Sequence, residues 1–251
     1  MSTTLKFGKK PATYDSRDFK FKHYRRGVLP SHPAQFGHED LIAADTWGML
    51  GNDAVGDCVF AGADHETILW TNEAGNPATF EAVNAIADYS AVTGYESDKP
   101  ETDRGTDVRE ALRYRQLTGL IDTAGTRHKI GAYLALEPGN IEDLLEALYL
   151  FSAVGIGLEV PESAISQFNA GHPWIVVHGK PQIVGGHYVP LVADRGNLVC
   201  VTWGRLQQMT LQFYKRYCDE AWAILSPEML KGGFSLEGFD LAQLQVDLSA
   251  L

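Results

Sequence analysis

The sequence has no long hydrophobic run and only three cysteines among its 251 residues. A membrane-spanning helix needs about 20 consecutive apolar residues, and no such stretch occurs, so we expect no membrane contact. The first residues, Met1 to Lys6, lack the apolar core of a secretory signal. Three cysteines cannot all pair with one another, and a chain that is not exported is expected to keep its thiols reduced. These features predict a cytoplasmic protein with free thiols.

Charge is distributed unevenly along the chain. The formal net charge is −11, yet residues 1–26 contain eight Lys or Arg and two Asp, a net charge of +6 that leaves −17 for the rest. Such a basic arm could fold back onto its own acidic body or bind an acidic surface of a protein assembly. We favour folding back, because aromatic residues that look like docking side chains interrupt the charges: Tyr14, Phe19, Phe21 and Tyr24. The acidic body argues against nucleic acid as the main ligand.

The pattern of apolar residues divides the chain into an arm and a domain with two halves. Residues 1–50 are interrupted by Pro and Gly and have no sustained period, which indicates an extended basic arm that packs on a domain of residues 51–251. In the first half of the domain, residues 51–150, a period of 3.6 predicts four helices. They are expected over Cys58–Asn72, Phe80–Thr93, Val108–Gly119 and Asn140–Leu150.

The period changes after Ser152, and the second half, residues 151–251, resembles an antiparallel sheet. Asp194–Asn197 is a turn that joins two of the expected strands into a hairpin. Gly155 and Gly157 lie inside another strand, where something is expected to approach the backbone closely. The strands are predicted over Ala153–Val160, Trp174–His178, His187–Ala193 and Leu198–Trp203. An α+β fold follows, with a helical half and an antiparallel β half.

Cys58 is the strongest candidate for a chemical role. It follows a Gly-Asp turn and opens the first predicted helix. The free N–H groups and the dipole at a helix N-terminus favour a thiolate over a thiol, which is how a cysteine nucleophile is usually activated. A small buried core cysteine is the alternative. His187, after Gly185 and Gly186 at the start of a strand, lies far away in sequence and is the candidate base that could meet Cys58 in space.

Other candidates have weaker support. His65-Glu66 lacks a second histidine four residues further on, so it is not a zinc-peptidase helix. His178 is a reserve base at a loop edge. Cys200 and Cys218 lack metal-ligand spacing, and the aromatic stretch from Tyr214 to Trp222 is expected in the core. We therefore predict no metal site and no cofactor.

The order of these segments resembles the papain-like cysteine peptidase family, in a bacterial or phage-type form. The likeness rests on the segments Phe7–Pro11, Arg17–Phe19, Leu29–Pro30, Asn52–Cys58, Asp103–Leu112, Leu136–Leu158, Gly186–Val192 and Thr202–Gly204. It implies a papain-like fold in which a helix carries the nucleophile Cys58, the sheet carries the base His187, and a cleft separates them. It also implies that Asn52 stabilises the oxyanion and that Trp203 shields the imidazole of His187.

Three residues depart from the family pattern. Asn52 stands where the family has a glutamine, and its side chain is one methylene shorter. Asp57 replaces a serine beside the nucleophile; it suits the N-cap of a helix, but its charge would raise the pKa of the thiol. Val201 stands where the family has the asparagine that orients the base, and valine cannot form that hydrogen bond. Thr202, Asn197 or Asp194 could substitute for it.

Two functions from different classes follow from these observations. The first is a papain-like cysteine hydrolase that cleaves a peptide or related amide bond in a peptide or protein substrate. The second is a catalytically silent protein that keeps the scaffold and uses its basic arm to dock on an assembly, for example as a component of a phage virion. An open cleft would favour the hydrolase, and a filled cleft would favour the silent scaffold.

Overall fold

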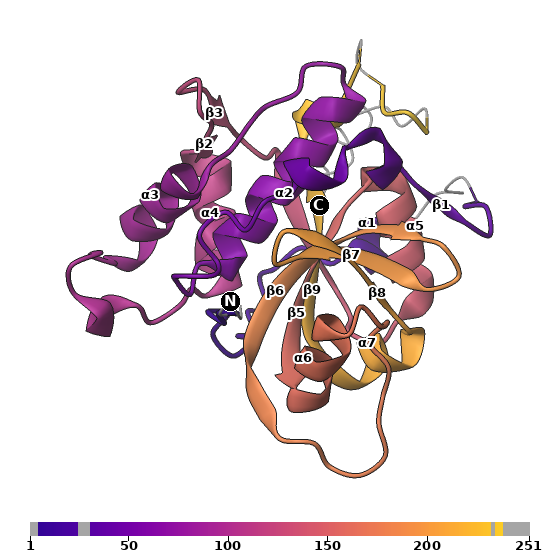
Figure 1. Cartoon of the computed structure of the whole chain (residues 1–251). Coiled ribbons are helices and arrows are strands. Elements are labelled where there is room, and N and C mark those ends of the chain that lie inside the picture. Colours follow the sequence, from indigo (N-terminus) through magenta and orange to yellow (C-terminus); the bar gives the residue numbers. More distant parts are fainter. Residues whose placement is uncertain (1–4, 25–30, 232–233, 238–251) are drawn as a thin grey trace.

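A computed structural model describes residues 5–24, 31–231 and 234–237 of the chain. Helices from the first half of the sequence lie together beside a twisted sheet (Figure 1). They are α2 (Cys58–Glu73), α3 (Ala82–Thr93) and α4 (Val108–Leu117), and a small hairpin of β2 (Leu120–Ile121) and β3 (Arg127–His128) accompanies them. A further helix, α5 (Ile141–Phe151), packs against the sheet. All four predicted helices are thus confirmed.

The ends of these helices show why the sequence folds locally in this way. The Asp107 side chain accepts hydrogen bonds from the backbone N–H groups of Arg109 and Glu110, and so caps α4. The Asn140 side chain accepts from Asp143 N and caps α5. Helix α2 is different, because nearly all of its residues are buried on every side. Helix α2 is therefore a central helix of the protein rather than a surface helix with one exposed face.

The second half of the chain forms an antiparallel sheet, as predicted. Among the described residues the sheet has the strand order β4-β9-β5-β6-β7-β8. Two strands come from earlier in the chain: β4 (Ala132–Leu136), and β1 (Phe36–Gly37), which pairs with the end of β6. The predicted strands are β5 (Val154–Pro161), β6 (Ile183–Asp194) and β7 (Leu198–Thr202), and the predicted hairpin joins β6 to β7. The pattern did not indicate β4 (Ala132–Leu136), β8 (Arg205–Met209), β9 (Cys218–Leu225), α6 (Glu162–Asn169) or α7 (Leu211–Tyr217).

The predicted strand over Trp174–His178 is wrong. Only Trp174 pairs with a strand, through an isolated bridge to Met209. The next backbone N–H, that of Ile175, donates instead to the side-chain oxygen of Gln167 on α6 at 3.0 Å. A side chain therefore takes the place of a neighbouring strand, and the segment continues as a loop.

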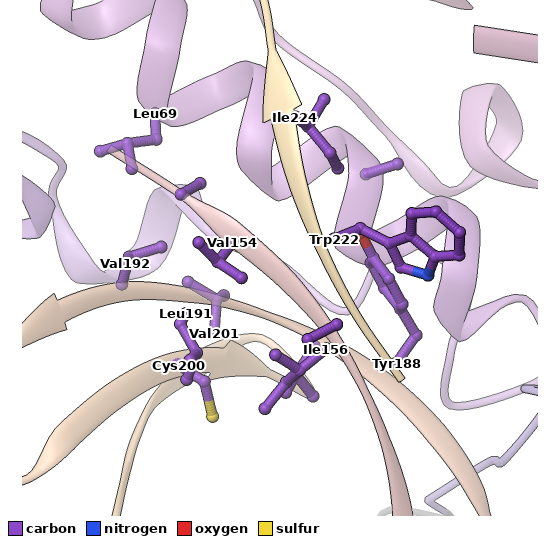
Figure 2. Packing of buried hydrophobic residues seen from close by; sticks show 14 of the residues in the cluster. Leu69, Val154, Ile156, Tyr188, Leu191, Val192, Cys200, Val201, Trp222 and Ile224 are labelled. Atoms are coloured by element: carbon purple, nitrogen blue, oxygen red, sulfur yellow. The ribbon is translucent and has the colours of Figure 1, made fainter. Parts of the chain in front are cut away.

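The core lies where the helices meet the sheet. Consecutive residues of β5, β6, β7 and β9 are buried on both faces of the sheet, among them Val154, Leu191, Cys200 and Ile224 (Figure 2). An ion pair is also buried there: Arg115 on α4 and Glu66 on α2 are 2.7 Å apart. Tyr188 on β6 donates to the same carboxylate at 2.8 Å. This contact links the helical half to the sheet.

Residues 5–24 of the basic arm lie along the body. Phe21, in the short helix α1 (Phe21–Tyr24), is fully buried, but Tyr14 and Phe19 are exposed, so these two do not dock as expected. The Tyr24 side chain, Arg25, Arg26 and the Leu29-Pro30 pair lie outside the described residues. Among the described residues, no helix is both long and apolar enough to span a bilayer.

Candidate active site

Cys58 is the first residue of α2 and is 1 % exposed. Burial raises the pKa of its thiol to about 12, although the backbone N–H groups of Tyr188, Gly8 and Lys9 act in the opposite direction. Asp57 occupies the N-cap position, but its side chain does not cap the helix. It is buried instead, and burial raises the pKa of this carboxyl well above its usual value. Helix position alone therefore does not activate the thiol in this conformation.

His187 lies on β6 with its imidazole held on two sides. Its Nε2 atom is 2.7 Å from the hydroxyl oxygen of Thr202 on β7. The indole of Trp203 stacks on the imidazole, with ring centroids 4.3 Å apart and an angle of 18° between the planes. Trp203 has a backbone φ of +44°, a conformation that bulky residues rarely adopt and that often marks a functional site. Thr202 thus makes the contact that Val201 cannot, and Trp203 covers the ring.

Cys58 and His187 line the same small space, together with Thr202, Trp203 and His65. The space measures about 10 Å³, about what one water molecule needs. The Nδ1 atom of His187 is buried and has no hydrogen-bond partner among the described residues, so no hydrogen bond joins it to the thiol of Cys58. Burial also lowers the pKa of His187 to about 3. Both groups are therefore neutral near pH 7, and the ion pair that would make a nucleophile is not formed.

Asn52 lines the space as well, but its side-chain amide donates to groups other than Cys58 and His187. The amide Nδ2 donates to the carbonyl of Val55 at 3.1 Å and to Asp57 Oδ1 at 3.2 Å. These two hydrogen bonds use both hydrogens of the amide. In this arrangement Asn52 fixes the turn before α2, and an oxyanion would have to compete with Val55 or Asp57 for its N–H groups.

The arm covers both candidate residues. The N–H groups of Gly8 and Lys9 donate to the carbonyl of Gly186, directly before His187, at 3.2 and 3.1 Å. The ring of Phe7 meets the imidazole edge to face at 5.9 Å, and the indole of Trp203 donates to the carbonyl of Lys6 at 3.2 Å. The helical half binds the same segment from its other side: the backbone N–H of Thr106 donates to the carbonyl of Gly8 at 2.7 Å. The space between the two halves is thus filled by the chain itself.

Glycines make this close approach possible. A Cβ atom on Gly8 would lie 1.7 Å from the carbonyl oxygen of Gly56, and one on Gly105 would lie 2.1 Å from the carbonyl oxygen of Gly8. On the sheet, a Cβ on Gly157 would lie 2.1 Å from Lys9 Cε. The expectation that a group approaches each glycine of this strand is therefore confirmed: the group is Lys9 of the arm at Gly157 and the hydroxyl of Tyr188 at Gly155.

The other candidates lie apart from this site or play other parts. His178 is exposed on a loop. Cys200 is buried in the core of β7, and Cys218 Sγ donates to the carbonyl of Glu220. His65 is the residue that sequence reasoning did not place here; its Nε2 atom contacts the carbonyl of Trp47 at 2.6 Å. His65 follows Cys58 by seven residues, about two turns of α2, and this spacing could have indicated that both side chains lie on the same face of the helix.

Comparison with known proteins gives similarity in structure alone. No protein family model matches the sequence, and no curated protein matches it. Among solved structures, the chain is similar to xylellain, a cysteine protease from Xylella fastidiosa, with a TM-score of 0.67, 15 % identity, and coverage of 90 % of this chain and 98 % of that one. It is also similar to procathepsin B from Trypanosoma congolense, with a TM-score of 0.57, 11 % identity, and coverage of 88 % and 86 %.

A third match is the digestive procathepsin L2 from Tenebrio molitor, with a TM-score of 0.55, 10 % identity, and coverage of 88 % of this chain and 78 % of that one. All three are cysteine proteases or their precursors, and each match covers both halves. The chain therefore has the papain-like fold that the resemblance implied. At these identities the likeness concerns the fold.

Proposed function

We propose that this protein is a papain-like cysteine hydrolase, of bacterial or phage type, that cleaves a peptide or related amide bond. The observation that carries the proposal is the Thr202 contact. It holds Nε2 of His187 at 2.7 Å and leaves Nδ1 without a partner among the described residues, in a side chain that lines the same space as Cys58. A base that is oriented on one side and unpaired on the other fits a nucleophile–base pair.

The chemistry follows from these positions once the arm has moved aside. Nδ1 of His187 takes the proton of Cys58, and the thiolate attacks the carbonyl carbon of the amide. The negative oxygen would be bound by the backbone N–H of Cys58 and by Asn52, after Asn52 exchanges one of its internal hydrogen bonds. The imidazolium then gives its proton to the leaving amine, and water hydrolyses the thioester. Trp203 keeps bulk water from the imidazole.

A second function is favoured by the burial of the site. Cys58 and His187 are each 1 % exposed and neutral, and the arm fills the cleft. A filled cleft suits a catalytically silent protein that binds a protein assembly, such as a virion. For either function we propose a cytoplasmic location, or the virion if the chain is phage-encoded.

Labelling of the thiols separates the two functions. The protein is treated at neutral pH with an epoxysuccinyl-type electrophile, and adducts are mapped by mass spectrometry on Cys58, Cys200 and Cys218. The same is done with Gly8→Ala, whose added Cβ would displace the arm. A hydrolase should show Cys58 reacting at least tenfold faster in Gly8→Ala than in the wild type, with peptide hydrolysis that Cys58→Ala abolishes. If Cys58 reacts no faster than the other two thiols in both proteins, the silent scaffold is correct.

A further inference from the structure

The side chain of Lys9 lies against the paired strands β5 and β9, where Gly157 and Glu220 are neighbours. Its ammonium group lies 2.7 Å from Asp219 Oδ2 and 3.2 Å from Glu220 Oε1, and it donates to the carbonyl of Lys10 at 2.9 Å. The side chain is only 1 % exposed. Its aliphatic stem lies against Gly157, where any side chain would collide with it. We call this binding place the pocket: Gly157 leaves room for a carbon chain, and the carboxylates of Asp219 and Glu220 bind the cation at its end.

The carboxylates are arranged to receive a cation. Burying a lysine costs several kcal/mol unless its charge is paired, and here hydrogen bonds and charge from Asp219 and Glu220 outweigh burial and raise the pKa of Lys9. Glu220 is fixed in place because its Oε2 atom accepts from Trp222 Nε1 at 3.0 Å. Asp219 Oδ1 is buried and has no hydrogen-bond partner in the part of the chain that the structure describes. One more donor could thus be accepted, which suits a guanidinium as well as an ammonium.

The pocket adjoins the candidate active site. The backbone of Lys9 binds Gly186, which precedes His187, and the backbone N–H of the preceding arm residue, Gly8, lies beside the thiol of Cys58. A substrate chain that reaches Cys58 has to take the place of the arm. In doing so it would meet the same backbone atoms of Gly186 and Thr106 and the same acidic pocket. The carboxylates of the pocket also line a surface hollow of about 290 Å³, together with Thr13 and Tyr14.

We propose that the pocket of Gly157, Asp219 and Glu220 recognises a lysine or arginine side chain of the peptide on which the protein acts, and that Lys9 is its resident occupant. That the recognised peptide is also the one cleaved rests on the proposed function. The pocket itself is a binding site for a cationic side chain whether or not the bound peptide is cleaved. The neighbouring Lys10 is exposed and makes no such contact, so it provides a matched comparison.

Binding of a peptide in trans tests the pocket without catalysis. The protein is full-length Cys58→Ala/Gly8→Ala, in which the arm is displaced and turnover is prevented. The probe is a fluorescent peptide with the sequence of residues 5–10, measured by anisotropy. Norleucine at the Lys9 position should weaken binding at least tenfold, norleucine at the Lys10 position less than threefold, and arginine at the Lys9 position less than threefold. Adding Glu220→Gln to the protein should also weaken binding of the parent peptide at least tenfold.

Equal binding of the two norleucine peptides would overturn the proposal, and so would failure of every peptide to bind at 1 mM. A second variant covers the case in which Gly8→Ala does not fold. Lys9→Ala leaves the arm in place and the pocket empty, so n-butylammonium should raise its Tm, whereas n-butanol should not. Lys10→Ala should respond to neither, and an equal response of the two variants would also overturn the proposal.

The two proposals fail in different ways. If the cationic peptide binds with the expected selectivity but the protein with intact Cys58 hydrolyses nothing, the hydrolase is wrong and the pocket stands. If peptides are hydrolysed with equal kcat/KM for lysine and norleucine at this position, the hydrolase stands and the pocket is wrong.

Discussion

Thr202 performs its task with a single hydroxyl group, which makes its contribution easy to isolate. Thr202→Val keeps the shape of the side chain but leaves Nε2 of the buried His187 without a partner. An unsatisfied buried polar group costs about 1–3 kcal/mol of unfolding free energy. We expect a loss in that range by urea unfolding, and at least a tenfold lower kcat/KM in any peptide hydrolysis. Thr202→Ser retains the hydroxyl and should stay close to the wild type; a serine variant as impaired as the valine variant would contradict this role.

His65 makes the stability of the protein depend on pH. Burial lowers the pKa of His65 to about 4, against about 6.5 in an unfolded chain. Between these values the unfolded chain binds a proton that the folded protein does not, so stability present above pH 6.5 is lost as the pH falls. From pH 7 to pH 5 this histidine alone should remove about 2 kcal/mol of unfolding free energy.

The measurement is urea unfolding at both pH values. His65→Gln, which can still donate to the carbonyl of Trp47, should lose about 2 kcal/mol less than the wild type over this interval. His172 is exposed, so His172→Gln should show the full wild-type loss. The prediction is wrong if the two variants lose the same amount.

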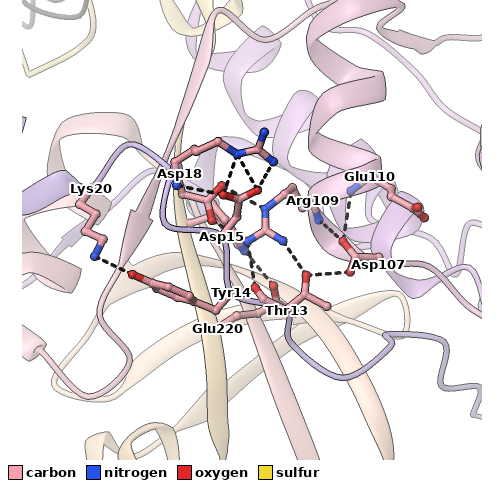
Figure 3. A network of polar contacts seen from close by, with 11 residues as sticks. Thr13, Tyr14, Asp15, Asp18, Lys20, Asp107, Arg109, Glu110 and Glu220 are labelled. Atoms are coloured by element: carbon pink, nitrogen blue, oxygen red, sulfur yellow. Dashed lines mark hydrogen bonds and ion pairs between the residues drawn. The ribbon is translucent and has the colours of Figure 1, made fainter. Parts of the chain in front are cut away.

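At the scale of the element, Asp107 has two tasks. One carboxylate oxygen caps α4, and the other accepts a hydrogen bond from the Thr13 hydroxyl of the arm at 3.0 Å (Figure 3). Asp107→Ala should cost about 1 kcal/mol for the lost cap and should also loosen the arm. We therefore expect labelling of Cys58 by a thiol reagent to become severalfold faster.

Asn140→Ala removes a comparable cap from α5 and provides the control. It should cost about the same in stability while leaving the labelling rate of Cys58 unchanged. Equal labelling rates in the two variants would show that the arm does not depend on Asp107.

The elements that could be predicted from the sequence are those whose pattern is local. Helix α4, for example, has an Asp cap, a 3.6-residue period and a closing glycine within twelve residues. Strand β9 was missed because its central position comes from pairing with β4 and β5. Its residues Asp219 and Glu220 interrupt the apolar pattern, and their charges are balanced by Lys9, about 210 residues away.

In the candidate site, too, only residues with a local sequence pattern could be predicted. Cys58 and His187 were indicated by their local surroundings, and Thr202 was one of three residues named as a substitute for the missing asparagine. Strand register decided among the three, because Asn197 Nδ2 bonds Gln208 and Asp194 accepts from Gly196 in the adjoining turn. The course of the arm over Cys58 was not predictable, since an extended segment with no period has no local pattern to read.

At the scale of the whole molecule, the buried contact among Arg115, Glu66 and Tyr188 joins the two halves. Arg115→Met leaves the Glu66 carboxylate buried without its cation, which typically costs about 3–5 kcal/mol. The double variant Arg115→Met/Glu66→Met removes the stranded charge and should regain most of that loss. Urea unfolding of the single and double variants measures both effects. A double variant as unstable as Arg115→Met alone would mean that the lost stability comes from packing.

The glycines that allow the arm to enter the cleft also provide a means of sorting other sequences. Gly8, Gly56 and Gly105 come from three separate parts of the chain, and each lies too close to the backbone of another segment for a side chain. A protein of this fold that keeps all three is expected to carry its first residues in the same groove. One that has replaced Gly56 or Gly105 by a larger residue has no room for them there. The joint presence or loss of three glycines thus predicts, from sequence alone, which relatives share a closed cleft.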